Sequence, residues 1–440
     1  MNGDHLEPYS TNGASQAEDE PGSPSSPNGT SGNDTASQGL NVTLRENRRM
    51  TPDTHWQDVR HLAFQSKSAV PYGPGDVLTI YPQNVRDDVD DLLERMDWAE
   101  VADKPIVFAP TTARDEGSLY PSPPIALLGK PTTLRILLTD HLDLTAIPRR
   151  SFFSLIAHFT DDQFHKDRLL EFTKPEYIDE LYDYTSRPRR SILEVFQEFA
   201  SVKIPWQWAA NVLPELRGRP FSIASGGELK ESLEGKARFE LLVAIVKYKT
   251  VIKKIREGVC TRYLAKLEVG TELRVTLQKG GLAIKGHEAK RPVIMVGPGT
   301  GVAPMRSLIW ERCQWGRSMG FNGSNLLFFG CRSESADYFY REEWERLKDT
   351  MPLEVYAAFS RDQNQKVYVQ DLIRQQSESV FRLLHEADGL VYVCGSSGKM
   401  PQAVRAALTD VFVERGMDQE AANRYLEDMA KGGRYKQETW

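Results

Sequence analysis

The chain has 440 residues, of which 40% are apolar, and a formal net charge of −6. This length predicts two or three domains with sizeable cores, and the mildly acidic balance argues against nucleic acid as a partner. Four scattered cysteines show no C-x-x-C pair and no metal-ligand spacing, which indicates a reducing compartment and no metal site. No run approaches the roughly 20 apolar residues that a membrane span needs. Because the sequence also shows no secretory signal, we expect a cytoplasmic protein.

Residues 1–50 are rich in Ser, Gly, Asn, Asp and Pro and contain few large apolar side chains. Such a segment buries too little apolar surface to offset the entropy lost when its backbone is ordered. We therefore expect a disordered tail.

Short strands separated by glycines frame a long helical region within residues 51–290. Strands are predicted at 58–64, 76–81, 241–246, 273–277 and 282–284. Between the two groups of strands, residues 87–213 carry apolar side chains at helical spacing, for example in 149–156 and 189–196. This order predicts a small antiparallel barrel with a helical insertion.

After Pro292 the pattern changes to alternating strands and helices. Strands are predicted at 293–296, 325–329, 354–359 and 390–394, and helices from Pro304, near Arg341, from Tyr368 and from Met400. Residues 291–440 are therefore predicted to form a doubly wound α/β domain with a parallel sheet. The expected fold class is a β-barrel followed by an α/β domain.

The stretch 292–309 has the pattern of a strand, a glycine loop and a helix. The apolar run before Gly297 is typical of a strand buried on both faces, and Pro304 fits the first turn of a helix. Between them, Gly299, Thr300 and Gly301 let the backbone approach a pyrophosphate at the helix start. Because the spacing is G-x-G-x-G and not G-x-G-x-x-G, an ordinary tight turn is an equal alternative.

Two motifs in the barrel region suit a ligand that joins a flat ring to phosphates. In Arg219-Pro220-Phe221-Ser222 the arginine can neutralise phosphate, the aromatic ring can stack and the serine can bond a ring edge. Gly258-Val259-Cys260-Thr261 opens a helix whose first N–H groups can hold phosphate. The alternatives are a core phenylalanine, a solvated arginine and a plain helix start.

Three features of the second half suit a nucleotide coenzyme. Ser360-Arg361 ends a predicted strand, and Lys366-Val367-Tyr368-Val369-Gln370 follows five residues later. Together they can clamp a 2′-phosphate, since the planar fork of arginine suits phosphate; the alternative is ordinary surface charge. Cys394 ends another predicted strand and can also be a buried structural cysteine. Trp440 can cover a flat ring or merely pack or fray.

The order and spacing of these motifs resemble the ferredoxin–NADP⁺ reductase superfamily, and specifically the FAD/NADPH half of the diflavin reductases. The similar words are R-P-F-S, G-V-C-T, G-P-G-T-G-V-A-P, S-R, K-V-Y-V-Q, Y-V-C-G and the final Trp. The resemblance extends from Thr54 to Trp440. Residues 147–153, 328–332 and 438–440 look most like the branch that acts in cytosolic iron–sulfur protein assembly.

The resemblance implies FAD and NADPH as cofactors, with FMN only in a domain outside this chain. The implied FAD contacts are Arg189, Arg219, Pro220, Phe221, Ser222, Gly258, Val259, Cys260 and Thr261. The implied contacts with the phosphates of NADPH are Gly299, Thr300 and Gly301, and those with its 2′-phosphate are Ser360, Arg361, Lys366, Val367, Tyr368, Val369 and Gln370. The residues implied around hydride transfer are Ser222, Cys394, Glu438 and Trp440, with Trp440 over the flavin ring.

Three departures from the family pattern limit what the resemblance implies. Glu438 replaces the usual Asp near the hydride-transfer locus, and Ala403 replaces an acidic NADP contact. The sequence also lacks a flavodoxin-like FMN domain with its phosphate loop between a strand and a helix.

The implied function is that of an NADPH-dependent FAD reductase, an enzyme that passes single electrons to an FMN domain or an iron–sulfur protein. Two alternatives stay open at this point. The first is a stand-alone reductase of ferredoxin type, and the second is a truncated interaction module without catalysis.

Overall fold

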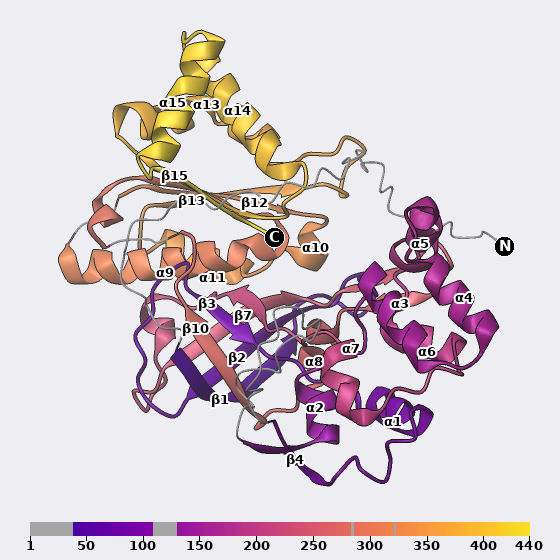
Figure 1. The fold of residues 1–440 in the computed structure, drawn as a ribbon. Helices are drawn as coiled ribbons and strands as arrows, with labels where there is room; N and C mark the ends of the chain where they lie inside the picture. The colour runs from indigo at the N-terminus through magenta and orange to yellow at the C-terminus, as the bar shows by residue number, and fades with distance from the viewer. Residues whose placement is uncertain (1–37, 109–129, 283–285, 321–322) are drawn as a thin grey trace, which may run out of the picture. The chain divides into compact units, whose positions relative to one another are not determined.

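A near-closed antiparallel barrel forms the first part of the computed structural model, which describes residues 38–108, 130–282, 286–320 and 323–440 (Figure 1). The strands are β1 (Gln38–Arg49), β2 (Val59–Ser66), β3 (Val77–Ile80), β6 (Arg219–Ser222), β7 (Arg238–Ala244) and β10 (Glu272–Gln278). They form one sheet in the order β6-β3-β10-β1-β2-β7. A bridge between Ile223 and Leu241 joins the two edges, so the sheet almost closes. The predicted barrel is confirmed, although residues 283 and 284 of the strand expected at 282–284 lie outside the described residues.

The central strand β1 corrects the expected extent of the disordered tail. Residues 38–49, which we assigned to the tail, pair with β10 on one side and with β2 on the other. Val42 and Leu44 are at most 1% exposed and alternate with polar residues, which is the period of a half-buried strand. The average composition of the first 50 residues concealed this short pattern. Residues 1–37 lie outside the described part of the chain.

The helical insertion lies between β3 and β6 and has its own hydrophobic core. Its helices are α1 (Arg86–Arg95), α2 (Leu134–Asp140), α3 (Arg150–Ile156), α4 (Gln163–Glu171), α5 (Ile178–Leu181), α6 (Ile192–Glu198) and α7 (Ala209–Val212). Phe152, Phe153, Phe172 and Phe196 pack together at its centre. A two-stranded sheet of β4 (Pro105–Val107) and β5 (Pro131–Thr133), which the helical pattern did not indicate, is also present.

A hairpin and a helix connect β7 to β10. The hairpin consists of β8 (Lys247–Lys249) and β9 (Ile255–Glu257), and α8 (Val259–Lys266) follows it directly. Only Gly258 separates β9 from α8, so the hairpin fixes where the helix begins.

The second part is a five-stranded parallel sheet with helices on both faces (Figure 1). The strands are β11 (Val293–Val296), β12 (Asn325–Cys331), β13 (Leu353–Phe359), β14 (Leu390–Gly395) and β15 (Tyr435–Thr439), in the order β13-β12-β11-β14-β15. The helices are α9 (Val302–Met319), α10 (Glu334–Asp337), α11 (Arg341–Lys348), α12 (Val369–Gln375), α13 (Ser377–Phe381), α14 (Met400–Glu414) and α15 (Gln419–Lys431). Alternate residues of β11 and β12 pack toward α9 and α11 on one face and toward α12, α14 and α15 on the other. The doubly wound domain is therefore confirmed, with β15 as an additional strand.

A buried charge cluster joins α9 to the barrel. Nη1 of Arg306 donates to the carbonyl oxygen of Ala224 (3.0 Å) and to Oε2 of Glu240 (2.6 Å). Nε and Nη2 donate to the two carboxylate oxygens of Glu343, both at 2.8 Å. Burial lowers the pKa of Arg306, but Tyr340, Glu343 and Glu240 outweigh burial and hold it above the usual range. Arg306 thus stays charged although it is only 3% exposed.

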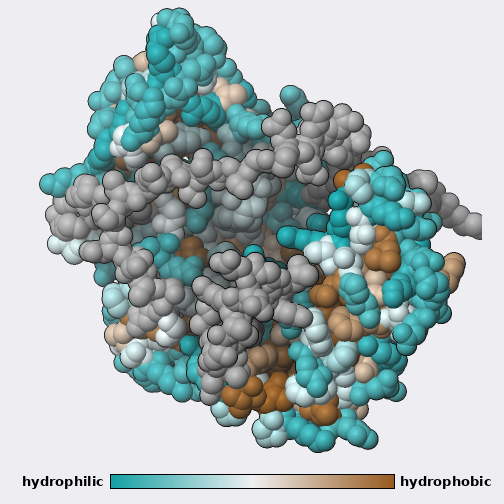
Figure 2. Space-filling model, viewed as in Figure 1, coloured by the Kyte–Doolittle hydropathy of each residue, from teal (hydrophilic) through white to brown (hydrophobic). Residues whose placement is uncertain are grey.

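The surface differs between the two parts. In Figure 2 the region of α14 and α15 is almost wholly hydrophilic, whereas apolar residues gather over the helical insertion. Phe164 of α4, Ile178 of α5 and Ile136 of α2 are all exposed. In the described part of the chain, no helix has the length and apolar character to cross a bilayer.

Candidate functional site

The glycine loop follows β11 and leads into α9, as the sequence predicted. Gly301 lies so close to the end of β14 that a Cβ atom there would be 2.3 Å from the carbonyl oxygen of Cys394. Gly299 has a φ of +57°, and a Cβ atom on it would meet no atom within 4 Å. One side of the loop is therefore packed against the sheet and the other is open, which suits a phosphate that approaches the backbone.

Two unpaired cations follow β13, the edge strand on the other side of β12 from β11. The backbone N–H of Ser360 donates to Cys331 O at 2.9 Å, and that of Arg361 to Arg332 O at 2.8 Å, so the chain is fixed at this edge. The side chains of Arg361 and Lys366 are exposed, and no carboxylate among the described residues pairs with either. Cations without acidic partners at the carboxyl edge of a parallel sheet are well placed to bind an anion.

The other residues expected beside these cations differ in exposure. Tyr368 is exposed, while Val367 and Gln370 are half-buried. Val369 is 3% exposed and packs in the core with Ile373, so its backbone is the better candidate for the expected contact.

Cys394 and Glu438 lie opposite each other on β14 and β15. Burial, and next the Glu438 carboxylate, raises the pKa of the Cys394 thiol. Burial also raises the pKa of Glu438, although the backbone N–H of Gly281 donates to this carboxylate and opposes the rise. Oε2 of Glu438 is buried and has no hydrogen-bond partner in the described part of the chain. This oxygen is therefore free to accept a hydrogen bond from a ligand group.

Ser222 is not brought to this pair by any contact in the described residues. It lies opposite Val77 across β3 and β6, on the barrel. A Cβ atom on Gly280 would lie 3.2 Å from Val77, and the next residue, Gly281, touches Glu438. The Gly280–Gly281 turn thus connects the neighbourhood of Ser222 to that of Glu438, a link for which the sequence offered only a generic turn signal.

Trp440 is fixed by its backbone and not by its side chain. Its N–H donates to Gly395 O, and its carbonyl oxygen accepts from Ser397 N, both at 3.0 Å. The indole is 54% exposed. The backbone of Trp440 is therefore bonded to Gly395, the residue after Cys394, and its exposed ring lies at the carboxyl edge of the sheet.

The R-P-F-S motif forms β6 and lies close to the start of α8. Phe221 is half-buried and packs against the barrel core, and Pro220 is exposed. Burial raises the pKa of Cys260 to about 12, and the positive charge of Arg219 opposes this rise. The charge of Arg219 thus acts on Cys260 in the first turn of α8, which is compatible with one site for both motifs.

The G-V-C-T motif offers its backbone rather than its side chains. The side chains of Val259 and Cys260 are buried. The hydroxyl of Thr261 donates to Gly258 O at 3.3 Å and accepts from Val246 N at 3.1 Å. The first N–H groups of a helix have no partner within the helix, so they are what the motif can present to phosphate.

Arg189 lies in a turn, which corrects the expectation of a helix from this residue. The helix α6 begins only at Ile192, and the φ of Arg189 is +54°. Its neighbour Arg190 stacks over Tyr184, 4.1 Å from the ring centroid, and pairs with Glu198 at 2.6 Å. Arg189 itself is exposed and has no acidic partner among the described residues, so it is the arginine that can bind an anion.

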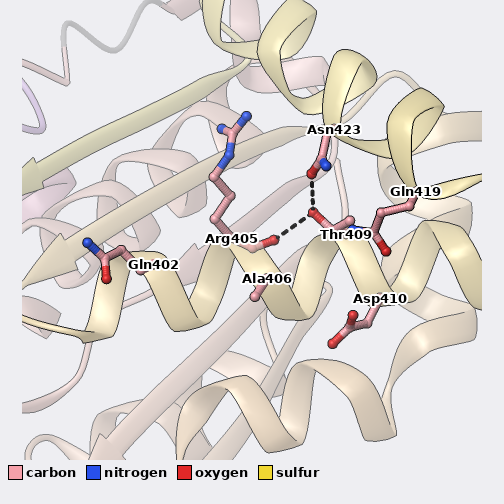
Figure 3. Close-up of a pocket in the computed structure, with 7 residues that line it drawn as sticks. All are labelled: Gln402, Arg405, Ala406, Thr409, Asp410, Gln419 and Asn423. Carbon is pink, nitrogen blue, oxygen red and sulfur yellow. Dashed lines mark hydrogen bonds between the residues drawn. The ribbon is translucent and has the colours of Figure 1, made fainter.

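The groove between α14 and α15 is a different place (Figure 3). It is lined by Gln402, Arg405, Ala406, Thr409, Asp410, Gln419 and Asn423. Its polar groups already bond one another, since the Thr409 hydroxyl lies 3.2 Å from both the Arg405 carbonyl and Asn423 Oδ1. None of the expected cofactor contacts lines this groove, and we do not assign it a ligand.

Comparison with known families shows which family the chain belongs to. The model of the FAD binding domain matches residues 32–263, more than half of the chain. The chain belongs to the FAD binding domain family. The chain also carries a second domain, because the model of the oxidoreductase NAD-binding domain matches residues 295–406. The family match begins ahead of β1, in agreement with the position of that strand in the barrel.

Several curated proteins align with most of this chain. Proteins named NADPH-dependent diflavin oxidoreductase 1 are 53% identical in Aspergillus fumigatus, 52% in Emericella nidulans and 38% in Saccharomyces cerevisiae. The alignments cover 90–91% of this chain and 63–64% of the three relatives. The chain therefore spans just under two thirds of the length of the relatives that it matches.

Proposed function

We propose that this chain is an NADPH-dependent flavoprotein reductase. When bound, FAD would accept hydride from NADPH and release electrons singly toward an FMN domain or an iron–sulfur protein. The proposal is carried by the unpaired cations Arg361 and Lys366 at the carboxyl edge of the NAD-binding sheet, in a chain whose other part matches an FAD binding domain. The names of the relatives support the choice of coenzyme and the onward route.

The barrel side would hold FAD. Arg219, Phe221 and Ser222 of β6 would meet the flavin and its phosphates, with Pro220 between them. Arg189 and the backbone of 258–261 would hold the pyrophosphate, since an unpaired guanidinium and a helix start both favour an anion.

The parallel-sheet side would hold NADPH. The open face of the Gly299–Gly301 loop would take the pyrophosphate. Ser360, Arg361, Lys366 and Tyr368, with Gln370 behind them, would select the 2′-phosphate, because NADH has no group for these cations to bind.

The pair Cys394 and Glu438 would lie where the two cofactors meet. Burial keeps the Cys394 thiol protonated, so it would donate a hydrogen bond and would not act as a thiolate. The unpartnered Oε2 of Glu438 would accept a hydrogen bond from a bound ring substituent. Ser222 would complete the polar surroundings from the barrel side, and Trp440 would cover the flavin.

The acceptor and the compartment are part of the same proposal. An FMN domain or an iron–sulfur protein of cytosolic cluster assembly is the proposed acceptor, in agreement with the diflavin relatives. A cytoplasmic location is supported by four cysteines that are all free, as expected of a reducing compartment.

One absorbance experiment tests the core of the proposal. The purified chain, loaded with FAD, should show a flavin spectrum that NADPH bleaches under anaerobic conditions, and it should reduce ferricyanide. A colourless chain that binds no FAD would return the molecule to the interaction-module alternative. Reduction of a ferredoxin without any added FMN domain would instead support the stand-alone reductase.

We predict that Cys394→Ala slows flavin reduction by NADPH about two- to tenfold, because the loss of one hydrogen bond near the transferred hydride is worth about 0.5–1.5 kcal/mol. Stopped-flow absorbance would measure this rate, and the bound FAD should be unchanged. Cys313→Ala is a matched control, since Cys313 is buried in the same core cluster but lies within α9. Equal rates in the two variants would assign Cys394 to core packing alone.

We predict that Trp440→Ala raises the activity with NADH about two- to tenfold, because an aromatic stack that the nicotinamide must displace is worth about 0.5–1.5 kcal/mol. NADPH offsets this cost through its 2′-phosphate contacts and should change less. Flavin emission should also become brighter. Phe164→Ala, which removes an exposed aromatic ring from α4, is the control. If coenzyme preference and emission both stay constant, the indole does not cover the flavin.

A further inference from the structure

An ion pair links the helical insertion to the hairpin that precedes α8. Nη1 of Arg256, in β9, donates to Oε2 of Glu194, in α6, at 2.7 Å. The two side chains are only 14% and 15% exposed. They are 62 residues apart in the sequence, so the pair fixes two elements that the chain itself does not hold together.

The side chain of Arg256 also bonds the turn that contains Arg189. Nε and Nη2 of Arg256 donate to the carbonyl oxygen of Pro188 at 3.2 and 3.0 Å. Glu194 closes the other end of the turn, since its Oε2 accepts from Ser191 N at 2.8 Å. The turn from Pro188 to Ser191 is thus held at both ends by one charge pair, with Arg189 at its exposed tip in a left-handed conformation.

The pair lies equally close to the start of α8. Arg256 is two residues ahead of Gly258, and Gly258 N donates to Val246 O at 2.9 Å in the adjoining segment. Val246 N in turn donates to the Thr261 hydroxyl in the first turn of α8. Arg256 therefore lies next to the hydrogen-bonded segment from which α8 begins.

We propose that Glu194 and Arg256 are positioning residues for the FAD pyrophosphate: they hold Arg189 against the first turn of α8 so that both meet the same anion. This inference rests on the proposed FAD site. Neither residue needs to contact FAD, because each acts through the backbone of the turn or of β9.

Arg262 of α8 also pairs with Asp88 of α1 and so joins the insertion to the barrel side, but this pair does not bond the turn. Arg168 pairs with Glu171 and Glu180, all within residues 168–180, and joins no part of the insertion to the barrel. Lys254 also bonds Glu194 but does not touch the turn. Arg168→Ala is therefore a suitable control, and Arg424→Ala, whose partner Glu420 lies on α15, is a second one.

The test is a titration of the full-length apoprotein with FAD, followed by flavin fluorescence. We expect Arg256→Ala and Arg189→Ala each to raise the Kd for FAD about tenfold, the size of one lost charge-assisted contact. Adding Arg256→Ala to Arg189→Ala should cost little more, because the first residue acts through the second. Glu194→Gln, which keeps the shape of the side chain, should raise Kd by a smaller factor. The two controls should not change it.

Each result decides between named alternatives. If the effects of Arg256→Ala and Arg189→Ala multiply in the double variant, Arg256 does not position Arg189 and the inference is overturned. If Arg189→Ala weakens FAD binding but neither Arg256→Ala nor Glu194→Gln does, the inference also fails while the FAD site stands. If the unmodified chain does not bind FAD, the proposed function itself fails. The Kd for 2′,5′-ADP should stay constant in all variants, which excludes general unfolding.

Discussion

Replacing Arg361 with Ala should lower kcat/KM for NADPH about ten- to a hundredfold, because one charge-assisted contact with phosphate is worth about 1.5–3 kcal/mol. The guanidinium is exposed at the end of β13, and no acidic side chain of the described residues competes for it. NADH carries no 2′-phosphate, so kcat/KM for NADH should stay nearly constant. Steady-state rates with both coenzymes would measure the ratio.

The control for this prediction is Arg424→Ala. Arg424 is also exposed, but it lies on α15 and pairs with Glu420 at 2.7 Å. It should leave both coenzymes unaffected. A variant of Arg361 that loses NADPH and NADH activity in equal proportion would contradict the assignment of the 2′-phosphate site.

Replacing Arg306 with Ala should lower the free energy of unfolding by about 3–5 kcal/mol, which is typical when one partner of a buried ion pair is removed. Arg306 and Glu240 are each 3% exposed. The substitution leaves Glu240 with Arg238 as its remaining close cation, at 2.8 Å, and leaves the carbonyl of Ala224 without this donor. Urea unfolding followed by tryptophan fluorescence would measure the loss.

A second arginine of the same helix provides the comparison. Arg317 pairs with Glu228 at 2.8 Å, but both side chains are more than half exposed. Arg317→Ala should therefore cost at most about 1 kcal/mol, as surface ion pairs usually do. Similar losses for the two variants would mean that burial does not strengthen the cluster between α9 and the barrel.

The sequence predicted most of the fold because both halves have a clear period. The buried run of β11 was predicted with the bounds that the structure has, Val293–Val296. In contrast, β1 was missed because its alternation is short and its surroundings are polar. The helix expected over 189–196 is present as α6 but begins later than predicted, because a left-handed residue and a capping serine delay its start to Ile192. Apolar spacing alone does not report such a local turn.

The candidate site was predictable where its residues are contiguous in sequence. The glycine loop and the Ser360–Arg361 edge lie at the ends of predicted strands, so their position followed from the topology. The pairing of Cys394 with Glu438 depends on the register of β15, a strand that the sequence did not reveal. The contact of Arg256 with Glu194 joins distant segments, and no spacing along the chain encodes it.

Within its first two turns, helix α9 both continues the glycine loop and bonds the barrel. It begins at Val302 directly after the glycine loop, and its fifth residue, Arg306, holds the barrel. Each residue of an α-helix turns the chain by about 100° and advances it by about 1.5 Å. One inserted or deleted residue between Gly301 and Arg306 would therefore rotate the guanidinium away from Glu240 or twist the loop away from the sheet. Changes of length should be tolerated in the connections of the helical insertion, whereas the length of the first turns of α9 fixes the spacing between the glycine loop and the barrel.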